Sequence, residues 1–396
     1  MYRKNINIYF IFNFLTTFQV TNVIMTLFFE KKISLFEIGI VFSIYQAVKV
    51  FLEVPTGLMA DKYGRKTSTF VGLLAWEIFL LTVYNWRSFE GFALASVFRG
   101  ISVACLTGGL DALFIDSVIL SNMKHKLSYF DSINRLIFFS AIGLSSLVGG
   151  YIANISYDYV YQFNIVIQAI PLLLLIFIKE TPRIGEITCN HSGIKLIDTI
   201  HYLLKTKILL YLISIDIYIA IAFMPIDQFY SNFLASTGIN VSIIGFMICT
   251  QFIISSCLGL YSKNVESKLG TTCLLQTFPV MFMVFIILML FSYNNVYLIV
   301  SLYSVALTFF TLQSPIRFKY LHLNLDCRYR STILSIRSLS MSLVGMLVNP
   351  VSGYLSITWG YRDTFLILTM ISIGLLITNN KIFRNEVHVI EAGAKY

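Results

Sequence analysis

Charged residues are scarce in this chain. Asp, Glu, Lys and Arg make up only 12% of the 396 residues, whereas 57% are hydrophobic and the mean hydropathy is +0.77. A soluble domain has no core large enough to bury so many apolar side chains. The composition therefore excludes a soluble protein and indicates that lipid surrounds most of the chain.

Residue patterns for bound metals, nucleotides and catalytic groups are also missing. The six cysteines form no C-x-x-C pair, the five histidines have no metal-ligand spacing, and no GxxxxGK[ST] phosphate loop occurs. We therefore expect no cofactor, no metal ion and no enzymatic activity. The weaker alternatives are a membrane enzyme, which needs a nucleophile and a base that the sequence does not pair, and a non-transporting sensor, which needs a soluble output domain.

Twelve apolar runs are long enough to cross a bilayer as helices. They cover residues 6–29, 34–59, 67–84, 92–118, 131–153, 159–178, 208–232, 241–262, 272–291, 295–316, 331–352 and 363–379. The sequence thus predicts an all-α polytopic membrane protein with twelve transmembrane helices in two pseudo-symmetric six-helix bundles.

A long polar interruption separates the first six runs from the last six. We expect an N-terminal bundle over 1–178, a central cytoplasmic loop over 179–207, a C-terminal bundle over 208–379 and a cytoplasmic tail over 380–396. Residues 194–204 of the central loop have the amphipathic pattern of a helix that lies on a membrane surface.

The basic residues are distributed unevenly among the loops. Lys and Arg number 29 against 20 Asp and Glu, a formal net charge of +9. Most of them fall on the side of the two termini, and the loops of the opposite side hold only Lys31, Lys32, Arg87 and Arg362. Because basic loops stay in the cytoplasm, we expect both termini there and no nucleic-acid partner. Abundant Ile, Asn, Lys and Tyr favour a low-GC bacterial gene and hence a bacterial cell membrane.

One charged turn between the second and third runs has a distinctive spacing. It reads GLMADKYGRK over residues 57–66 and follows EVPT over 53–56. Glycine allows a positive φ and a close approach of two helix ends. The pattern G-x-x-x-D-x-x-G-R-K resembles the signature loop of the major facilitator superfamily, and EVPT extends the resemblance to its drug-efflux-like bacterial members.

This resemblance implies a cytoplasmic gate at the loop. The residues to which it assigns gating roles are Gly57, Asp61, Gly64, Arg65, Lys66 and Asp116. Asp116 ends the fourth span and can pair with Arg65, an ion pair that latches the gate in the family. Residues 259–270 occupy the same place after the eighth span but hold Lys263 where the aspartate is expected, so we interpret them as a decayed second copy.

Ionisable side chains inside the spans point to the transport pathway, because each costs at least about 2.5–3.5 kcal/mol in the bilayer without a partner or water. The candidates for proton coupling are Asp111, Glu53, Arg99 and Asp216. Asp111 is the favoured carboxyl, although a hydrogen bond between helices explains it equally well. Arg99 resembles the arginine that the family ties to proton coupling in its fourth helix.

Polar residues near the middle of the spans are candidates to line a substrate cavity. They are Lys49, Glu77, Asp227, Gln228 and Asn349. Lys49 and Glu53 are four residues apart on one helix face, so they either neutralise each other or leave Lys49 to meet an anionic or zwitterionic substrate.

The resemblance implies a secondary transporter that exports an amphiphilic small molecule, such as an antibiotic, an antimicrobial or a siderophore, by proton antiport. The alternative is proton-coupled uptake of a small nutrient. We expect the partners to be this substrate, protons and the lipid bilayer, and we expect the protein to be a monomer.

Overall fold

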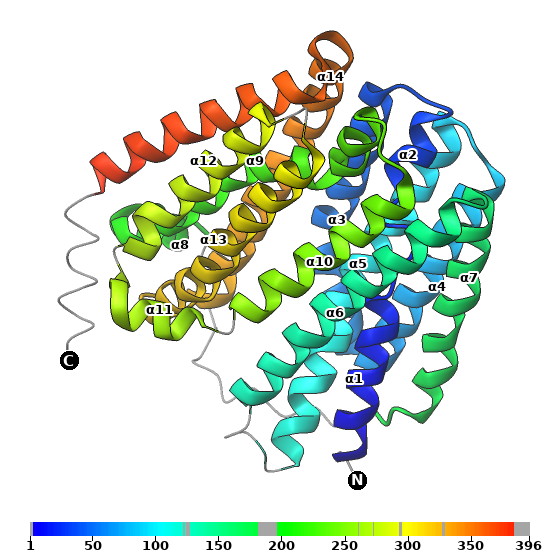
Figure 1. Cartoon of the computed structure of the whole chain (residues 1–396). Coiled ribbons are helices and arrows are strands. Elements are labelled where there is room, and N and C mark those ends of the chain that lie inside the picture. The colour runs from blue at the N-terminus through cyan, green and yellow to red at the C-terminus, as the bar shows by residue number, and fades with distance from the viewer. Residues whose placement is uncertain are drawn as a thin grey trace. The chain divides into compact units, whose positions relative to one another are not determined.

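The structure is a computed structural model that describes residues 3–121, 123, 127–180, 196–259, 261–271, 273–292, 295–326 and 329–383. Every regular element in these ranges is a helix (Figure 1). Residues 181–195 of the expected central loop and most of the expected tail lie outside the described residues.

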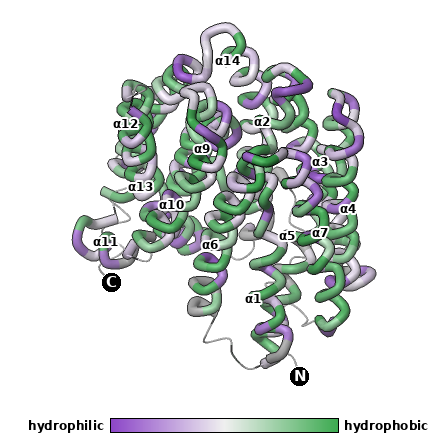
Figure 2. The backbone as a smooth tube through the Cα atoms, turned by 45° about the vertical axis from the view of Figure 1, so that its right-hand side comes forward, coloured by the Kyte–Doolittle hydropathy of each residue, from purple (hydrophilic) through white to green (hydrophobic). Residues whose placement is uncertain are grey.

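The helices follow the predicted runs closely. Their bounds are α1 Arg3–Thr17, α2 Met25–Glu30, α3 Leu35–Tyr63, α4 Arg65–Asn85, α5 Phe89–Leu120, α6 Leu127–Ala153, α7 Tyr157–Leu174, η2 Leu175–Phe177, α8 Leu196–Lys205, α9 Lys207–Ser236, α10 Val241–Gly259, α11 Ser262–Leu269, η3 Cys273–Thr277, α12 Phe278–Phe291, α13 Val296–Leu323 and α14 Arg330–Ile382. Along the chain, hydrophobic residues dominate the long helices, whereas the short α11 is hydrophilic (Figure 2).

Ten helices of the described residues are long and apolar enough to cross a membrane. One of them, α14, contains a break at Gly360, where φ is 79° and ψ is 167°, so it holds both of the last two predicted spans. The first predicted span is divided between α1 and α2. The prediction of an all-α polytopic membrane protein is confirmed.

The first predicted span, 6–29, is not one helix as expected. It is interrupted between Thr17 and Met25, and side chains of α7 bind the freed backbone. Asn164 accepts from the Val20 N–H at 3.1 Å, and Gln168 Nε2 donates to the carbonyls of Leu15 and Phe18, both at 2.9 Å. A break inside a bilayer requires such partners, because no water is there to replace them.

The chain divides into two compact units. Unit 1 comprises Met1–Ile184, Phe229–Ile253 and Asn349–Ile357, and unit 2 comprises Gly185–Gln228, Ile254–Val348 and Thr358–Tyr396. Unit 1 thus combines α1 to α7 with parts of α9, α10 and α14. The expected bundle boundaries at 178 and 208 stay a prediction.

Glycines bring backbones into contact within unit 1, at the helix ends opposite the Gly64 turn. A Cβ on Gly39 of α3 would overlap the carbonyl oxygen of Asn349 on α14. A Cβ on Gly150 of α6 would lie 3.0 Å from the Cα of Gly245 on α10. Small residues at these crossings allow helices from the two halves of the sequence to pack without intervening side chains.

An aromatic core fixes α5 at the Gly64 end of unit 1. The rings of Tyr9 on α1 and Phe114 on α5 stack with centroids 4.0 Å apart, and Phe130 of α6 packs edge-on against Phe114. All three side chains are buried. This core holds α5 next to α1 and α6, and so fixes the position of Asp116, two residues beyond Phe114.

In unit 2, the amphipathic segment predicted at 194–204 forms α8. Tyr202 of α8 stacks on Tyr329 with centroids 4.5 Å apart, and its hydroxyl donates to the Asn324 carbonyl at 3.3 Å. These contacts fix α8 to the connection between α13 and α14.

Candidate functional site

The charged turn predicted at 57–66 is a one-residue connection between α3 and α4. Tyr63 ends α3, Arg65 begins α4, and Gly64 between them has φ 102° and ψ 150°. This region of backbone space is accessible almost only to glycine, because a Cβ would clash with the neighbouring peptide. The second glycine of the motif is therefore required by the turn itself.

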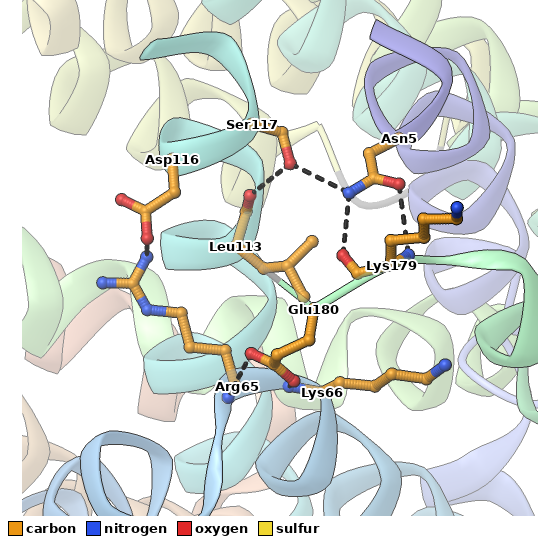
Figure 3. A network of polar contacts seen from close by, with 8 residues as sticks. All are labelled: Asn5, Arg65, Lys66, Leu113, Asp116, Ser117, Lys179 and Glu180. Atoms are coloured by element: carbon orange, nitrogen blue, oxygen red, sulfur yellow. Dashed lines mark hydrogen bonds and ion pairs between the residues drawn. The ribbon is translucent and has the colours of Figure 1, made fainter. Parts of the chain in front are cut away.

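Arg65 forms the predicted ion pair with Asp116 of α5 (Figure 3). The carboxylate is largely buried, with 10% of its side chain exposed, and the guanidinium is 24% exposed. The pairing predicted from the sequence is confirmed, while the gating role that the family resemblance gives it stays a prediction.

A second carboxylate holds the same turn from the other side. Glu180 accepts from the backbone N–H groups of Arg65 and Lys66, both at 2.9 Å (Figure 3). These are the first N–H groups of α4, and Gly64 has no side chain to cap them. A carboxylate at a helix N-terminus satisfies such donors and interacts favourably with the helix dipole.

Glu180 was missed as a site residue in the sequence analysis. It directly follows the sixth predicted span, on the same side of the membrane as the charged turn at 57–66. That position could have indicated a contact with the turn. Lys66 adds a further tie to the same segment, since its Nζ donates to the Ile176 carbonyl at 3.3 Å.

Asn5 joins this segment to α1 and α5. Its Nδ2 donates to the Lys179 carbonyl at 2.9 Å and to Ser117 Oγ at 3.2 Å, and its Oδ1 accepts from the Lys179 N–H at 3.2 Å (Figure 3). Asn5 is 2% exposed. The start of α4, the end of α5, the start of α1 and the segment after α7 are thus connected by polar contacts.

The first glycine of the motif does not provide the close helix approach that we expected. A Cβ on Gly57 would have nothing within 4 Å. The close approach occurs instead at Gly109 of α5, where a Cβ would lie 3.0 Å from the Arg65 carbonyl oxygen. The side chains of Asp61 and Asp111 lie outside the described residues, so their roles stay predictions.

The decayed copy in the second half contains the same turn. Gly270 follows α11 with φ 80° and ψ 158°, nearly the conformation of Gly64. Superposing the two glycines places Ser267, not Lys263, at the position of Asp61, which corrects our register. Thr271 then corresponds to Arg65, and its hydroxyl lies 3.0 Å from the Tyr320 hydroxyl on α13.

An ion pair is present near the Gly270 turn as well, but at other positions. Lys319 Nζ lies 3.0 Å from Glu266 Oε1, and the lysine side chain is 52% exposed. Glu266 precedes the turn glycine by four residues, whereas Arg65 follows its glycine directly. This is a surface pair and not the counterpart of the Arg65–Asp116 contact.

Lys49 and Glu53 do not form the ion pair that their spacing permits. Both side chains are half-buried on α3, and no ion pair of either is found among the described residues. The structure therefore does not show the mutual neutralisation of our first interpretation, and the role of Lys49 in meeting the substrate stays a prediction.

Arg99 lies among aromatic rings. Its guanidinium carbon is 4.6 Å from the ring centroid of Tyr45, 5.4 Å from that of Phe42 and 5.9 Å from that of Phe79. Cation–π contacts stabilise a guanidinium in an apolar region. Rings from α3 and α4 thus surround the arginine of α5.

Asp216 is not isolated in its helix. It is 3% exposed, and both of its oxygens contact arginines of unit 2: Oδ1 lies 2.7 Å from Arg317 Nε, and Oδ2 lies 2.5 Å from Arg337 Nε. Our topology counted both arginines among the cytoplasmic segments, and the structure places them in α13 and α14. Asp216, Arg317 and Arg337 are called the Asp216 cluster below.

The remaining cavity candidates differ in their immediate surroundings. Glu77 of α4 is half-buried, and its Oε1 has no hydrogen-bond partner in the described part of the chain. Gln228 Oε1 and both side-chain polar atoms of Asn349 are likewise buried without a partner there. Asp227 is exposed.

A polar contact joins the two halves of the sequence at the end opposite the Gly64 turn. Glu30, the last residue of α2, accepts from Asn232 Nδ2 of α9 at 2.5 Å. The neighbouring Lys31 lies over the ring of Tyr157, 3.7 Å from its centroid. All of these residues belong to unit 1.

Known proteins resemble this chain over most of its length. The sequence profile of the Major Facilitator Superfamily matches residues 8–320. The chain is 21% identical to the uncharacterized MFS-type transporter YxaM of Bacillus subtilis (strain 168), over 86% of each protein. It is also 21% identical to an uncharacterized transporter of Buchnera aphidicola subsp. Baizongia pistaciae (strain Bp), over 88% of each.

Solved structures share the fold. A mutant of the nucleoside transporter NupG has a TM-score of 0.75 at 16% identity, covering 96% of this chain and 99% of its own. A D-xylose-proton symporter has a TM-score of 0.74 at 13% identity, covering 94% and 96%. An inward-facing, unoccupied bacterial homolog of the human lysosomal transporter Spinster has a TM-score of 0.73 at 14% identity, covering 97% and 98%.

Proposed function

This chain belongs to the Major Facilitator Superfamily, and from that premise we propose that it is a secondary transporter that exports an amphiphilic small molecule in exchange for protons. The observation that carries the proposal is the Gly64 turn, which two carboxylates hold in place. Asp116 pairs with the Arg65 side chain, and Glu180 accepts from the Arg65 backbone N–H. In alternating access, contacts of this kind must form and break once per cycle.

The gate role follows from the exposure of these contacts. The Arg65–Asp116 pair is partly accessible to water, and Glu180 is exposed. Rearranging them therefore costs less than breaking a fully buried ion pair. We assign the Gly64 end to the cytoplasm and the end with Glu30 and Asn232 to the outside, with both termini cytoplasmic, in a bacterial cell membrane.

Proton coupling requires a carboxyl that can be reached from the transport pathway. Asp111 and Glu53 are the carboxyl candidates that remain after Asp216 is found paired with two arginines. We add Glu77, which the sequence analysis placed among the cavity candidates. The Glu77 Oε1, buried and without a hydrogen-bond partner among the described residues, supports a role for this side chain. Arg99 and Lys49 provide positive charge on neighbouring helices.

Proton-coupled uptake of a small nutrient is the second candidate. It is favoured by the similarity in fold to a D-xylose-proton symporter. The direction of transport decides between the two, because the same carboxyl can load a proton from either side.

The test uses purified protein in proteoliposomes with a pH-sensitive dye and a panel of amphiphilic antimicrobials and small nutrients. For export, the protein is oriented with its cytoplasmic side facing the lumen, and the outside is made more acidic than the lumen. A loaded antimicrobial should then leave the lumen as protons enter, and Asp111→Asn should abolish the exchange. Asp158→Asn, in the exposed pair with Arg87, is the matched control and should transport normally.

One result would overturn the proposal, and a second would reassign the coupling carboxyl. If a nutrient enters together with protons and no antimicrobial moves, the uptake candidate replaces export. If Asp111→Asn transports normally, proton coupling moves to Glu53 or Glu77, and the corresponding glutamine variants decide between them.

A further inference from the structure

The Asp216 cluster contains more positive than negative charge. Two guanidiniums, those of Arg317 and Arg337, contact the single carboxylate of Asp216. No other carboxylate forms an ion pair with either arginine in the part of the chain that the structure describes. Arginine stays protonated in proteins, so the cluster carries a net charge of about +1.

Most of the cluster is buried. Asp216 and Arg317 are 3% and 5% exposed, whereas the Arg337 side chain is 27% exposed. Water therefore solvates only part of the excess positive charge, and a further anion bound at the cluster would stabilise it.

Unused hydrogen-bond donors lie beside the excess charge. The Arg317 Nη1 is buried and has no hydrogen-bond partner among the described residues. Gln313, one helical turn earlier on α13 and on the same face, is 0% exposed, and neither its Nε2 nor its Oε1 has a partner there. A buried polar group is normally hydrogen-bonded, so the two donors among these atoms, Arg317 Nη1 and Gln313 Nε2, point to a missing ligand that accepts hydrogen bonds.

Arg337 gives an anion access to the Asp216 cluster from water. Its side chain is 27% exposed, whereas the other two members of the cluster are almost fully covered. An anion that arrives at Arg337 would therefore meet a guanidinium with access to water before it reached the deeper Arg317.

We propose that Arg317, Arg337 and Gln313 form a binding site for an oxyanion, namely a carboxylate, phosphate or sulfonate group of the transported molecule. The planar guanidinium matches these groups with two parallel N–H donors. That the anion belongs to the transported molecule rests on the transport function proposed above. The binding site itself does not.

In this arrangement Asp216 competes with the ligand for the two arginines. Removing its charge should strengthen anion binding, whereas removing an arginine should weaken it. In a binding site, substituting Asp216 and substituting an arginine therefore change the anion affinity in opposite directions. In a purely structural ion pair, both substitutions would act in the same direction.

The test measures thermal unfolding of the full chain in detergent as inorganic phosphate is added to a constant background of sodium chloride. Phosphate should raise the unfolding temperature of the wild type. Because a hydrogen bond to a charged group contributes about 1.5–3 kcal/mol, Arg317→Gln should weaken phosphate binding about tenfold or more. Asp216→Asn should strengthen it by a similar factor.

Two further variants keep the test decisive if a charge change prevents folding. Gln313→Leu removes the amide without altering any charge and should weaken phosphate binding. Arg87→Gln removes an arginine of the other unit, paired with Asp158, and should bind phosphate as the wild type does. Equal responses of wild type and Arg317→Gln, or weaker binding by Asp216→Asn, would overturn the site.

A transport experiment tests whether the bound anion is part of the substrate. Proteoliposomes are loaded with one carboxylic acid and its methyl ester in parallel, and the wild type should move the acid at least about tenfold faster. If acid and ester move equally, the anion is not part of the substrate, while the proposed transport stands. If phosphate binds but no compound of the panel moves, the oxyanion site stands and the proposed function fails.

Discussion

The Gly64 turn and the Gly270 turn have nearly the same backbone conformation but different side chains around them. Both glycines have a positive φ and a ψ near 150°, and each connects a helix to the start of the next span. Arg65 and Asp116 meet beside the first turn, whereas Thr271 and Tyr320 meet beside the second. The backbone conformation is common to both turns, and an ion pair formed by the residue directly after the glycine is found at the first turn.

This difference separates what the fold needs from what the proposed gate adds. A sharp connection between two spanning helices requires glycine in either half. A hydroxyl pair is sufficient to connect the second turn to α13. We infer that the Arg65–Asp116 pair, together with Glu180, serves a step that only the first half performs.

The largest expected effect comes from removing the carboxylate of the first turn. Asp116→Ala removes the largely buried carboxylate that pairs with Arg65, so we expect a loss of about 3 kcal/mol in the free energy of unfolding. Thermal unfolding in detergent measures it. The exchange Arg65→Asp with Asp116→Arg should recover part of the loss, and a double variant no better than Asp116→Ala would show that the pair itself contributes nothing.

The next effect tests the shared backbone. Gly64→Ala and Gly270→Ala both force a side chain into a region that costs about 1–3 kcal/mol, so both should lower the unfolding temperature. In Gly64→Ala the new Cβ would also lie 3.1 Å from Glu180 Oε2, at the end of a side chain that can shift. Gly57→Ala is the control. It lies inside α3 with open space around it and should be neutral or slightly stabilising.

A smaller effect is expected at the second turn. Tyr320→Phe removes one partner of a buried hydroxyl pair and should cost about 1 kcal/mol. Transport should be nearly unchanged if this turn is structural. A loss of transport as complete as that of Asp116→Ala, at normal stability, would contradict the assignment of the gate to the first half.

The smallest effect is expected at the cap of α4. Glu180→Gln keeps an acceptor but removes the charge, so we expect a loss of about 0.3–1 kcal/mol that shrinks as salt is added. Unfolding in low and high salt measures it. A loss that does not change with salt would show that Glu180 stabilises the cap through hydrogen-bond geometry and not through its charge. Glu266→Gln, in the exposed pair with Lys319, is the matched control in the other half.

The sequence was sufficient for most of the helices and for one of the contacts that hold the Gly64 turn. Apolar length predicts spans directly, and the motif placed Arg65 opposite Asp116 before any coordinates. The partners of Asp216 could not be found in this way. Arg317 and Arg337 lie near helix ends, where a charged residue looks like part of a loop, and only packing reveals that Asp216 draws them inward.

Contacts between segments far apart in the sequence explain the other misses. Glu180 caps α4 from 114 and 115 residues away. The interruption of the first span is completed by α7. Thr17, Gln19, Thr21 and Asn22 make the sequence around Val20 locally polar, but they do not show that the partners come from α7. No periodicity in a short window encodes such a partner.

The interruption between α1 and α2 also has a consequence for how the protein is made. The amides that complete it, Asn164 and Gln168, follow their backbone partners by 144 to 153 residues. At about 5–20 residues per second, a ribosome needs roughly 10 to 30 seconds to supply them. During that interval the nascent first segment has backbone groups unsatisfied in lipid, so we expect an insertion factor or water at the translocon to hold it. The first segment to emerge is then completed only when α7, which carries Asn164 and Gln168, has been synthesised.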